Sequence, residues 1–497
     1  MAASNNILAK EHTIAGPGYN RWLVPPAALA IHLSIGMAYG FSVFWLPLSK
    51  AIGITNPVPC PDDLSFFARI TATTCDWKVS MLTPMFMMFF VVLGGSAAIF
   101  GHWLEHEGPR KAGVVAAFCW GGGLLISAVG VYIHQVWLMW LGSGIIGGVG
   151  LGLGYISPVS TLIKWFPDRR GMATGMAIMG FGGGAMIGSP LANILMKYYA
   201  TPTSVGVWQT FVTLGVLYFI AMICGAFGYR LPAANWKPAG WTPPVETKAM
   251  ITAHHVHLNE AHKTPQFWLL WAVLCLNVSA GIGIIGMASP MLQEIFGGKL
   301  IGVGDVFEKL TPDQLKLTAT IGAGFAALLS LSNIAGRIGW ASFSDFLGRK
   351  RTYFVFFALG FVLYVSARSA GTFATPAIFV AIFCVILTMY GGGFATIPAY
   401  LADIFGTQFV GAIHGRLLTA WSTAGVLSQL VPLIREYEID HGAARADAYN
   451  PIFYLMAGLL VLGFVCNWLV KPVAEKHYMS EEELAAERKR MHEAARR

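Results

Sequence analysis

Apolar residues dominate the chain in long runs, and short polar stretches separate these runs. A helix that crosses a bilayer needs about 20 apolar residues, and twelve runs approach or exceed that length. We interpret them as α-helices because lipid offers the backbone no hydrogen-bond partners. The predicted spans are 22–50, 79–101, 112–133, 137–163, 171–197, 207–230, 266–294, 317–343, 352–370, 374–398, 408–434 and 451–471. The pattern therefore predicts an all-α membrane protein with twelve transmembrane helices.

The composition agrees with this interpretation. Of 497 residues 55% are hydrophobic and only 12% are charged, whereas soluble domains carry about 25% charged residues. The first twenty residues are polar, so we expect no cleavable signal peptide. The net charge of +8 is not arranged as a basic patch with interleaved aromatic residues, which argues against nucleic acid as a partner.

The placement of Lys and Arg predicts the orientation. The terminal segments and the loops on their side of the membrane hold about twice as many Lys and Arg residues as the opposite loops. This asymmetry predicts that both termini are cytoplasmic. Cys60 and Cys75 share a polar loop on the opposite side, where they are either a disulfide or two free thiols.

The polar segment 231–265 divides the chain into similar halves. We expect a cytoplasmic segment 1–21, a six-helix bundle 22–230, a cytoplasmic linker, a second bundle 266–471 and a cytoplasmic tail 472–497. One constant offset aligns residues of the two halves: Glu105 with Asp345, Gly108 with Gly348, Arg110 with Lys350, Lys111 with Arg351, Pro158 with Pro398, Gly171 with Gly411, and Gly175 with Gly415. Two repeated bundles with a binding site between them are typical of transporters.

Arg337 is the candidate at the centre of the functional hypothesis. An arginine inside a membrane segment costs at least ~2.5–3.5 kcal/mol on insertion scales, so it usually faces a cavity or a partner. Its planar fork of donors suits a carboxylate. The alternative is a structural ion pair near the end of its span.

Two turns with the pattern acidic-x-x-Gly-x-basic-basic, at 105–111 and 345–351, resemble the signature loop of the major facilitator superfamily. More narrowly, the chain resembles the oxalate/formate antiporter family. The segments that match are Lys164–Gly171 (KWFPDRRG), Thr264–Trp271 (TPQFWLLW), Asn333–Lys350 and Asp403–Gly406 (DIFG).

This resemblance implies exchange of small carboxylates such as oxalate, formate, pyruvate or lactate across the bacterial inner membrane. It assigns Arg337 to the anion, and Trp421 stands where the family's best-known oxalate exchanger has a lysine. His32, His414 and Arg416 are the alternatives for a second charge. The resemblance also implies that aromatic residues line the cavity, namely Tyr39, Tyr155, Tyr390 and, where tyrosines are replaced, Phe181 and Phe394.

A group of charged residues at the cytoplasmic ends of the spans is predicted to gate the path by pairing between the bundles: Glu105, Asp345, Arg169, Arg170 and Arg349. We expect no cofactor, no metal at the histidine-rich linker, no enzyme activity, and a monomer whose partners are the lipid bilayer and a small carboxylate. Proton-coupled monocarboxylate symport remains the first alternative function, and a non-transporting membrane sensor the second.

Overall fold

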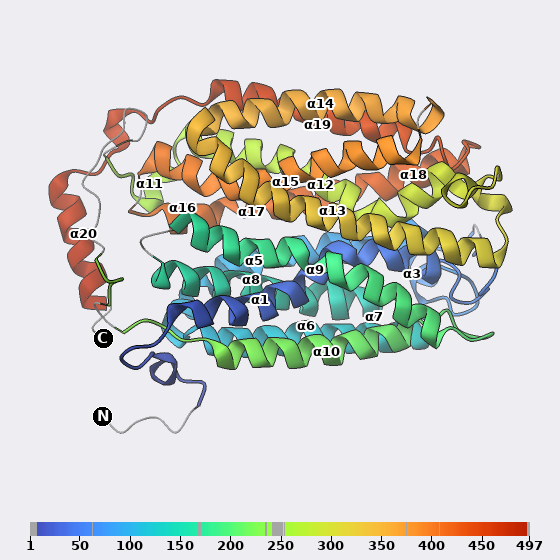
Figure 1. The fold of residues 1–497 in the computed structure, drawn as a ribbon, viewed down its shortest axis with the longest axis horizontal. Coiled ribbons are helices and arrows are strands. Elements are labelled where there is room, and N and C mark those ends of the chain that lie inside the picture. The colour runs from blue at the N-terminus through green and yellow to red at the C-terminus, as the bar shows by residue number, and fades with distance from the viewer. Residues whose placement is uncertain are drawn as a thin grey trace.

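The computed structural model describes residues 7–494 apart from 62, 167–169, 234–235, 241–251, 253, 374 and 407. Among the described residues, twelve helical segments are long and apolar enough to cross a membrane. The predicted all-α architecture is therefore confirmed. The helices run side by side along the long axis of the molecule (Figure 1).

The first half contains six spans. They are α1 (Val24–Ile35) continued by η3 (Gly36–Phe44) and α2 (Trp45–Leu48), then α4 (Val79–Leu82) with α5 (Pro84–Glu107), α6 (Pro109–Tyr132), α7 (Val136–Met139) with η4 (Trp140–Gly147) and α8 (Gly148–Trp165), α9 (Arg170–Tyr199), and α10 (Val207–Gly228).

The second half also contains six spans. Its spans are α12 (Pro265–Phe296) with η6 (Gly297–Ile301), α13 (Pro312–Leu347), α14 (Arg349–Phe373), α15 (Pro376–Phe405), the series α16 (Val410–Leu417), α17 (Thr419–Ser428) and α18 (Leu430–Asp440), and α19 (Asn450–Leu469). Shorter elements outside the spans are η1 (Lys10–Thr13), η2 (Arg21–Leu23), α3 (Phe66–Thr71), α11 (Leu258–Ala261), η7 (Phe307–Lys309), η8 (Glu475–His477) and α20 (Glu481–Ala494).

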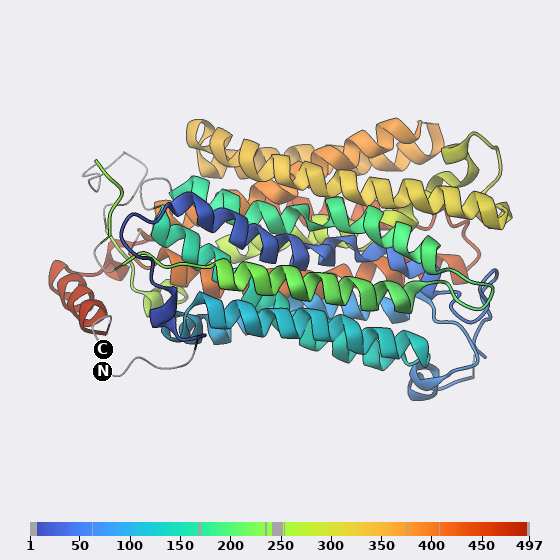
Figure 2. The same cartoon turned by 60° about the horizontal axis from the view of Figure 1, so that its bottom comes forward.

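The two halves form two bundles that lie against each other. In Figure 1 the helices of the first half fill the lower part and those of the second half the upper part. Figure 2 shows α20 at the end of the molecule where the termini lie, with the blue loop after α2 at the opposite end. We call these the terminal end and the disulfide end.

Several spans depart from the regular helices that the apolar pattern predicts. The eighth begins at Pro312 because Thr311 and Gln314 form a capping box in the polar flank. The eleventh is divided at Leu418 and Gln429 into three helices. The fourth contains a π-helical stretch, Trp140–Gly147, an irregularity often found at functional sites.

A disulfide and a set of hydrogen bonds hold the loop at the disulfide end in place. Cys60 and Cys75 form a disulfide with their Cα atoms 4.9 Å apart. The carboxylate of the adjacent Asp76 accepts hydrogen bonds from the backbone N–H groups of Ile52, Gly53 and Val58 at 2.7, 3.0 and 2.8 Å. These bonds satisfy backbone donors that the irregular loop would otherwise leave unpaired.

Candidate functional site

Arg337 lies on α13 where that helix faces both bundles. Its side chain is fully buried, and its Nε donates to Asn333 Oδ1 at 2.9 Å, one helical turn earlier. A Cβ atom on Gly182 of α9, in the first bundle, would approach Arg337 Nε to 3.1 Å. The guanidinium is therefore enclosed by protein at the bundle interface, and it does not face lipid.

Two glycines allow α13 and α15 to pack closely against each other. A Cβ atom on Gly336 would lie 1.9 Å from the backbone oxygen of Thr388, and one on Gly391 would lie 2.2 Å from that of Asn333. Any larger residue at either position would push the helices apart. This close packing brings Arg337 beside the middle of α15, where Tyr390 and Phe394 are placed.

Aromatic rings surround the guanidinium. Its Cζ lies 5.3 Å from the ring centroid of Phe394, a cation–π arrangement. Phe394 packs on Trp421 at 4.5 Å, and Trp421 packs on Tyr155 and Phe181 at 5.5 Å each. The rings that form this enclosure, which we call the aromatic cage, are Tyr39, Phe90, Tyr155, Phe181, Tyr390, Phe394 and Trp421.

The two bundles meet inside the cage. The hydroxyl groups of Tyr39 on η3 and Tyr390 on α15 are hydrogen-bonded to each other at 2.8 Å. The structure thus brings together the arginine, the three tyrosines and the tryptophan singled out in the sequence.

The cage holds an excess of hydrogen-bond donors. Among the described residues, buried atoms without a hydrogen-bond partner include Arg337 Nη1 and Nη2, Asn333 Nδ2, Trp421 Nε1 and the Tyr155 hydroxyl. The first four atoms are donors only, and the hydroxyl is both donor and acceptor. Buried polar groups are nearly always paired, so a concentration of unpaired donors indicates a place for an acceptor.

The other candidates for a second charge make contacts of their own, and one of them, His32, packs against the cage rings of Tyr155 and Phe181. Arg416 donates from Nη1 to the Leu258 backbone oxygen at 2.9 Å and from Nη2 to Asn259 Oδ1 at 3.1 Å, so it fastens the linker at the terminal end. His32 lies behind the cage, with Nε2 3.2 Å from the backbone oxygen of Tyr155. His414 Nε2 is buried and has no partner among the described residues.

The predicted gating group is only partly described. Arg169 lies outside the described residues, as do the side chains of Glu105 and Arg170. Asp345 pairs with Arg349, and Arg349 Nε lies 3.9 Å from Asp403 Oδ2. All three belong to the second bundle. Because the first-bundle members of the group lie outside the described side chains, pairing of Asp345 or Arg349 with the first bundle stays a prediction.

A group of described contacts joins the bundles at the disulfide end. Glu436 on α18 accepts from Ser80 N at 2.7 Å and from Ser80 Oγ at 2.6 Å. Lys78 and Asp440 pair at 2.7 Å, and Gln429 Nε2 donates to Thr83 Oγ1 at 2.8 Å. The bundles are closed at this end.

Sequence reasoning missed two residues of the site, Asn333 and Phe90. Asn333 had a detectable signal, because it precedes Arg337 by four residues and therefore lies on the same face of the helix. Phe90 is one of several phenylalanines in α5, and periodicity alone does not distinguish a cage ring from a packing ring.

The histidine-rich linker forms packing contacts. His257 Nε2 lies 3.6 Å from Glu487 Oε1 of α20, and Val256 forms a β-bridge with Tyr478. In the described part of the chain, no three His, Cys, Asp or Glu side chains gather as a metal site.

Comparison with known proteins gives consistent results. A model of the Major Facilitator Superfamily matches residues 27–429. The oxalate:formate antiporter of Oxalobacter formigenes is 23% identical over 95% of this chain and 97% of its own length. Apicoplast pyruvate carrier 1 of Toxoplasma gondii is 28% identical over 72% of this chain and 70% of its own. YhjX of Escherichia coli, an uncharacterized transporter of the Major Facilitator Superfamily type, is 23% identical over 80% of this chain and 83% of its own length.

Solved structures agree on the fold. The xylose transporter XylE from E. coli, in a partially occluded inward-open conformation, superposes with a TM-score of 0.61 at 12% identity over 91% of this chain and 98% of its own. A bacterial homologue of the lysosomal transporter Spinster, in an inward-facing and unoccupied conformation, superposes with a TM-score of 0.62 at 14% identity. This match covers 94% of this chain and 100% of the homologue.

Proposed function

Since the chain belongs to the Major Facilitator Superfamily and is a secondary transporter rather than an enzyme, we propose that its cargo is a small monocarboxylate anion. The observation that carries the proposal is the pair of unpaired Nη groups of Arg337, buried among further unpaired donors of the described residues. A carboxylate supplies two acceptor oxygens that fit the two free Nη groups of the fork.

Charge balance favours a monoanion over a dianion. Arg337 is the one charged side chain among the described residues of the cage. A monocarboxylate would neutralise the charge of Arg337, whereas the dicarboxylate oxalate would leave one negative charge uncompensated in a buried space. An unpaired buried ion costs several kcal/mol even after relaxation. The pyruvate carrier among the relatives is named for a monoanion, and the antiporter for one monoanion and one dianion.

The same electrostatics supports exchange by alternating access. An empty cage holds an uncompensated cation, and closing both ends around it is costly. A bound carboxylate removes that cost, so the loaded carrier reorients more readily than the empty one. The described cage contains no Asp or Glu to carry a proton with the substrate, which favours exchange over proton-coupled symport.

The excess of Lys and Arg at the terminal end supports an orientation with that end in the cytoplasm. Under this orientation the contacts of Ser80 with Glu436 and of Lys78 with Asp440 close the outer side. The disulfide then lies outside a bacterial inner membrane, where oxidising conditions preserve it.

Counterflow in proteoliposomes tests the proposal. Liposomes loaded with unlabelled formate, pyruvate, lactate or oxalate are diluted into the labelled acid, with and without a pH gradient. We expect rapid uptake of monoanions that depends on internal acid and not on the gradient. Uptake driven by the gradient into empty liposomes would establish symport, and no uptake of any acid would refute a carboxylate carrier.

A further inference from the structure

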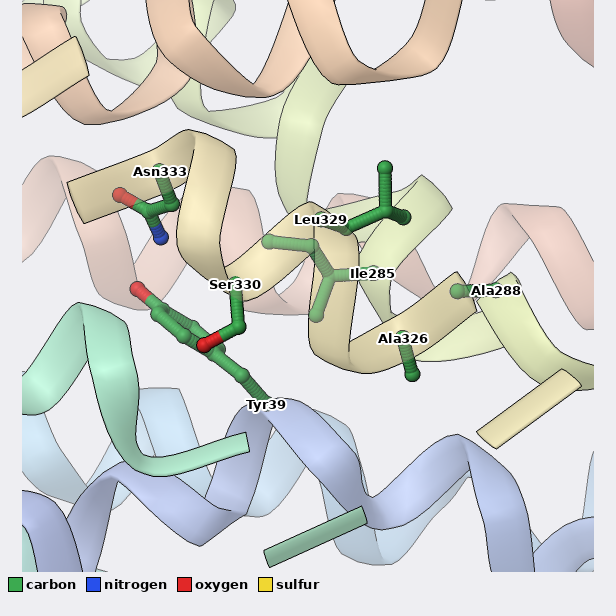
Figure 3. Close-up of a pocket in the computed structure, with 7 residues that line it drawn as sticks. All are labelled: Tyr39, Ile285, Ala288, Ala326, Leu329, Ser330 and Asn333. Carbon is green, nitrogen blue, oxygen red and sulfur yellow. The ribbon is translucent and has the colours of Figure 1, made fainter. Parts of the chain in front are cut away.

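A small cavity opens beside the cage between η3, α12 and α13. Its space not filled by atoms comes to about 220 Å³ when the adjoining open space is included, and it leaves room for about one water molecule. Figure 3 shows that its polar groups gather at one side: the Asn333 amide, the Ser330 hydroxyl and the Tyr39 hydroxyl. Its other side is entirely apolar, with Ile285, Ala288, Ala326 and Leu329 extending away from them.

The polar side of this cavity adjoins Arg337 through one shared residue, Asn333. Asn333 lines the cavity and accepts from Arg337 Nε, and its own Nδ2 is fully buried without a partner among the described residues. Asn333 therefore connects Arg337 to the cavity, and the apolar chamber lies at the other side of that cavity.

We propose that the chamber formed by Ile285, Ala288, Ala326 and Leu329 is a subsite for the apolar tail of the carboxylate. This inference rests on the proposed function and narrows it to monocarboxylates that carry a methyl-sized tail. Formate has no group to place there, and the second carboxylate of oxalate would lose its hydration against four apolar side chains.

The size of the chamber sets the expected selectivity. Burial of one methyl or methylene group is worth about a fourfold gain in affinity. The space admits about one such group. We therefore expect acetate to compete with labelled formate about four times better than unlabelled formate does, with no further gain for propionate or butyrate.

Two substitutions change the chamber in opposite directions. Leu329→Ala enlarges it and should move the optimum to propionate or butyrate, and Ala326→Leu fills it and should remove the advantage of acetate. Leu328→Ala is the matched control because Leu328 adjoins Leu329 but is 40% exposed on the outer face of α13. This control should leave the order of the four acids unchanged.

The measurement is the concentration of each acid that halves counterflow of labelled formate, and formate exchange itself reports that each variant is folded. If the four acids shift in parallel in Leu329→Ala and Leu328→Ala, the chamber is not a tail subsite. Wild-type exchange of formate without any gain for acetate would also overturn this inference while sustaining the proposed function. Absence of exchange in the wild type for these four acids and for pyruvate, lactate and oxalate would instead overturn the proposed function.

Discussion

Two buried arginines in the second bundle allow the role of Arg337 to be tested by the sign of a stability change. Arg337 and Arg435 are 0% and 3% exposed. Arg435 Nε donates to Glu294 Oε2 at 2.7 Å and its Nη2 contacts Glu294 Oε1, whereas Arg337 Nη1 and Nη2 have no partner among the described residues. One arginine completes an ion pair, and the other has two unpaired Nη groups among the described residues.

Substitution by methionine should therefore have opposite effects. In Arg337→Met an unpaired buried charge is replaced by an apolar side chain, which we expect to be neutral or to stabilise the ligand-free protein by ~1–4 kcal/mol. In Arg435→Met the carboxylate of Glu294 loses its main partner, which should destabilise the protein by ~3–5 kcal/mol. Only Arg337→Met should abolish counterflow while raising or preserving the melting temperature.

The assay is thermal unfolding in detergent, with and without a monocarboxylate, beside counterflow in proteoliposomes. A ligand at 100 times its dissociation constant stabilises a protein by ~2.7 kcal/mol, so the wild type should melt at a higher temperature in its presence and Arg337→Met should not respond. The reasoning is refuted if Arg337→Met melts as early as Arg435→Met, or if the acid stabilises the Arg337→Met variant as strongly as the wild type.

Two further predictions concern charge and pH. Trp421→Lys places a second cation in the cage and should raise the rate of oxalate exchange relative to formate exchange at least tenfold. The reason is that two opposite charges 4 Å apart interact by ~4 kcal/mol at an effective dielectric of 20. Trp421→Met adds no charge and should leave this ratio unchanged. Burial lowers the pKa of His134 from its ordinary value of 6.5, where Nε2 lies 2.8 Å from the Cys75 backbone oxygen and the ring stacks on Trp77. The unfolded chain then binds a proton that the folded protein excludes, so stability should fall as the pH drops below about 6.5 until His134 is protonated in the folded state as well; the melting temperature of His134→Gln should lose this part of the pH dependence.

The spans could be predicted from the sequence because lipid imposes a simple constraint. Every backbone polar group must be paired within the segment, so the length and polarity of a run determine that it is a helix and that it crosses. The sequence determined the ends of the helices less well. The start of α13 depends on Thr311 and Gln314, whose capping hydrogen bonds extend the helix beyond its apolar residues.

The central residues of the site were also visible in the sequence. Arg337 stands out because charge is expensive inside a membrane, and the resemblance to a carboxylate exchanger pointed to the tyrosines. The gating role of Asp345 and Arg349 stays a prediction, because the nearest partner of each charged group is decided by packing. A list of charged residues contains no information on which bundle each one faces.

The amino-acid sequence by itself determined the number of crossings, the twofold repeat and the presence of a costly buried cation. Only the tertiary structure decided what surrounds that cation. Residues as distant along the chain as Tyr39 and Tyr390 meet at 2.8 Å, and the close approach of α13 and α15 at Gly336 and Gly391 places Arg337 among them. The physical reason is that membrane insertion depends on properties local to each segment, whereas a binding site depends on which helix faces meet.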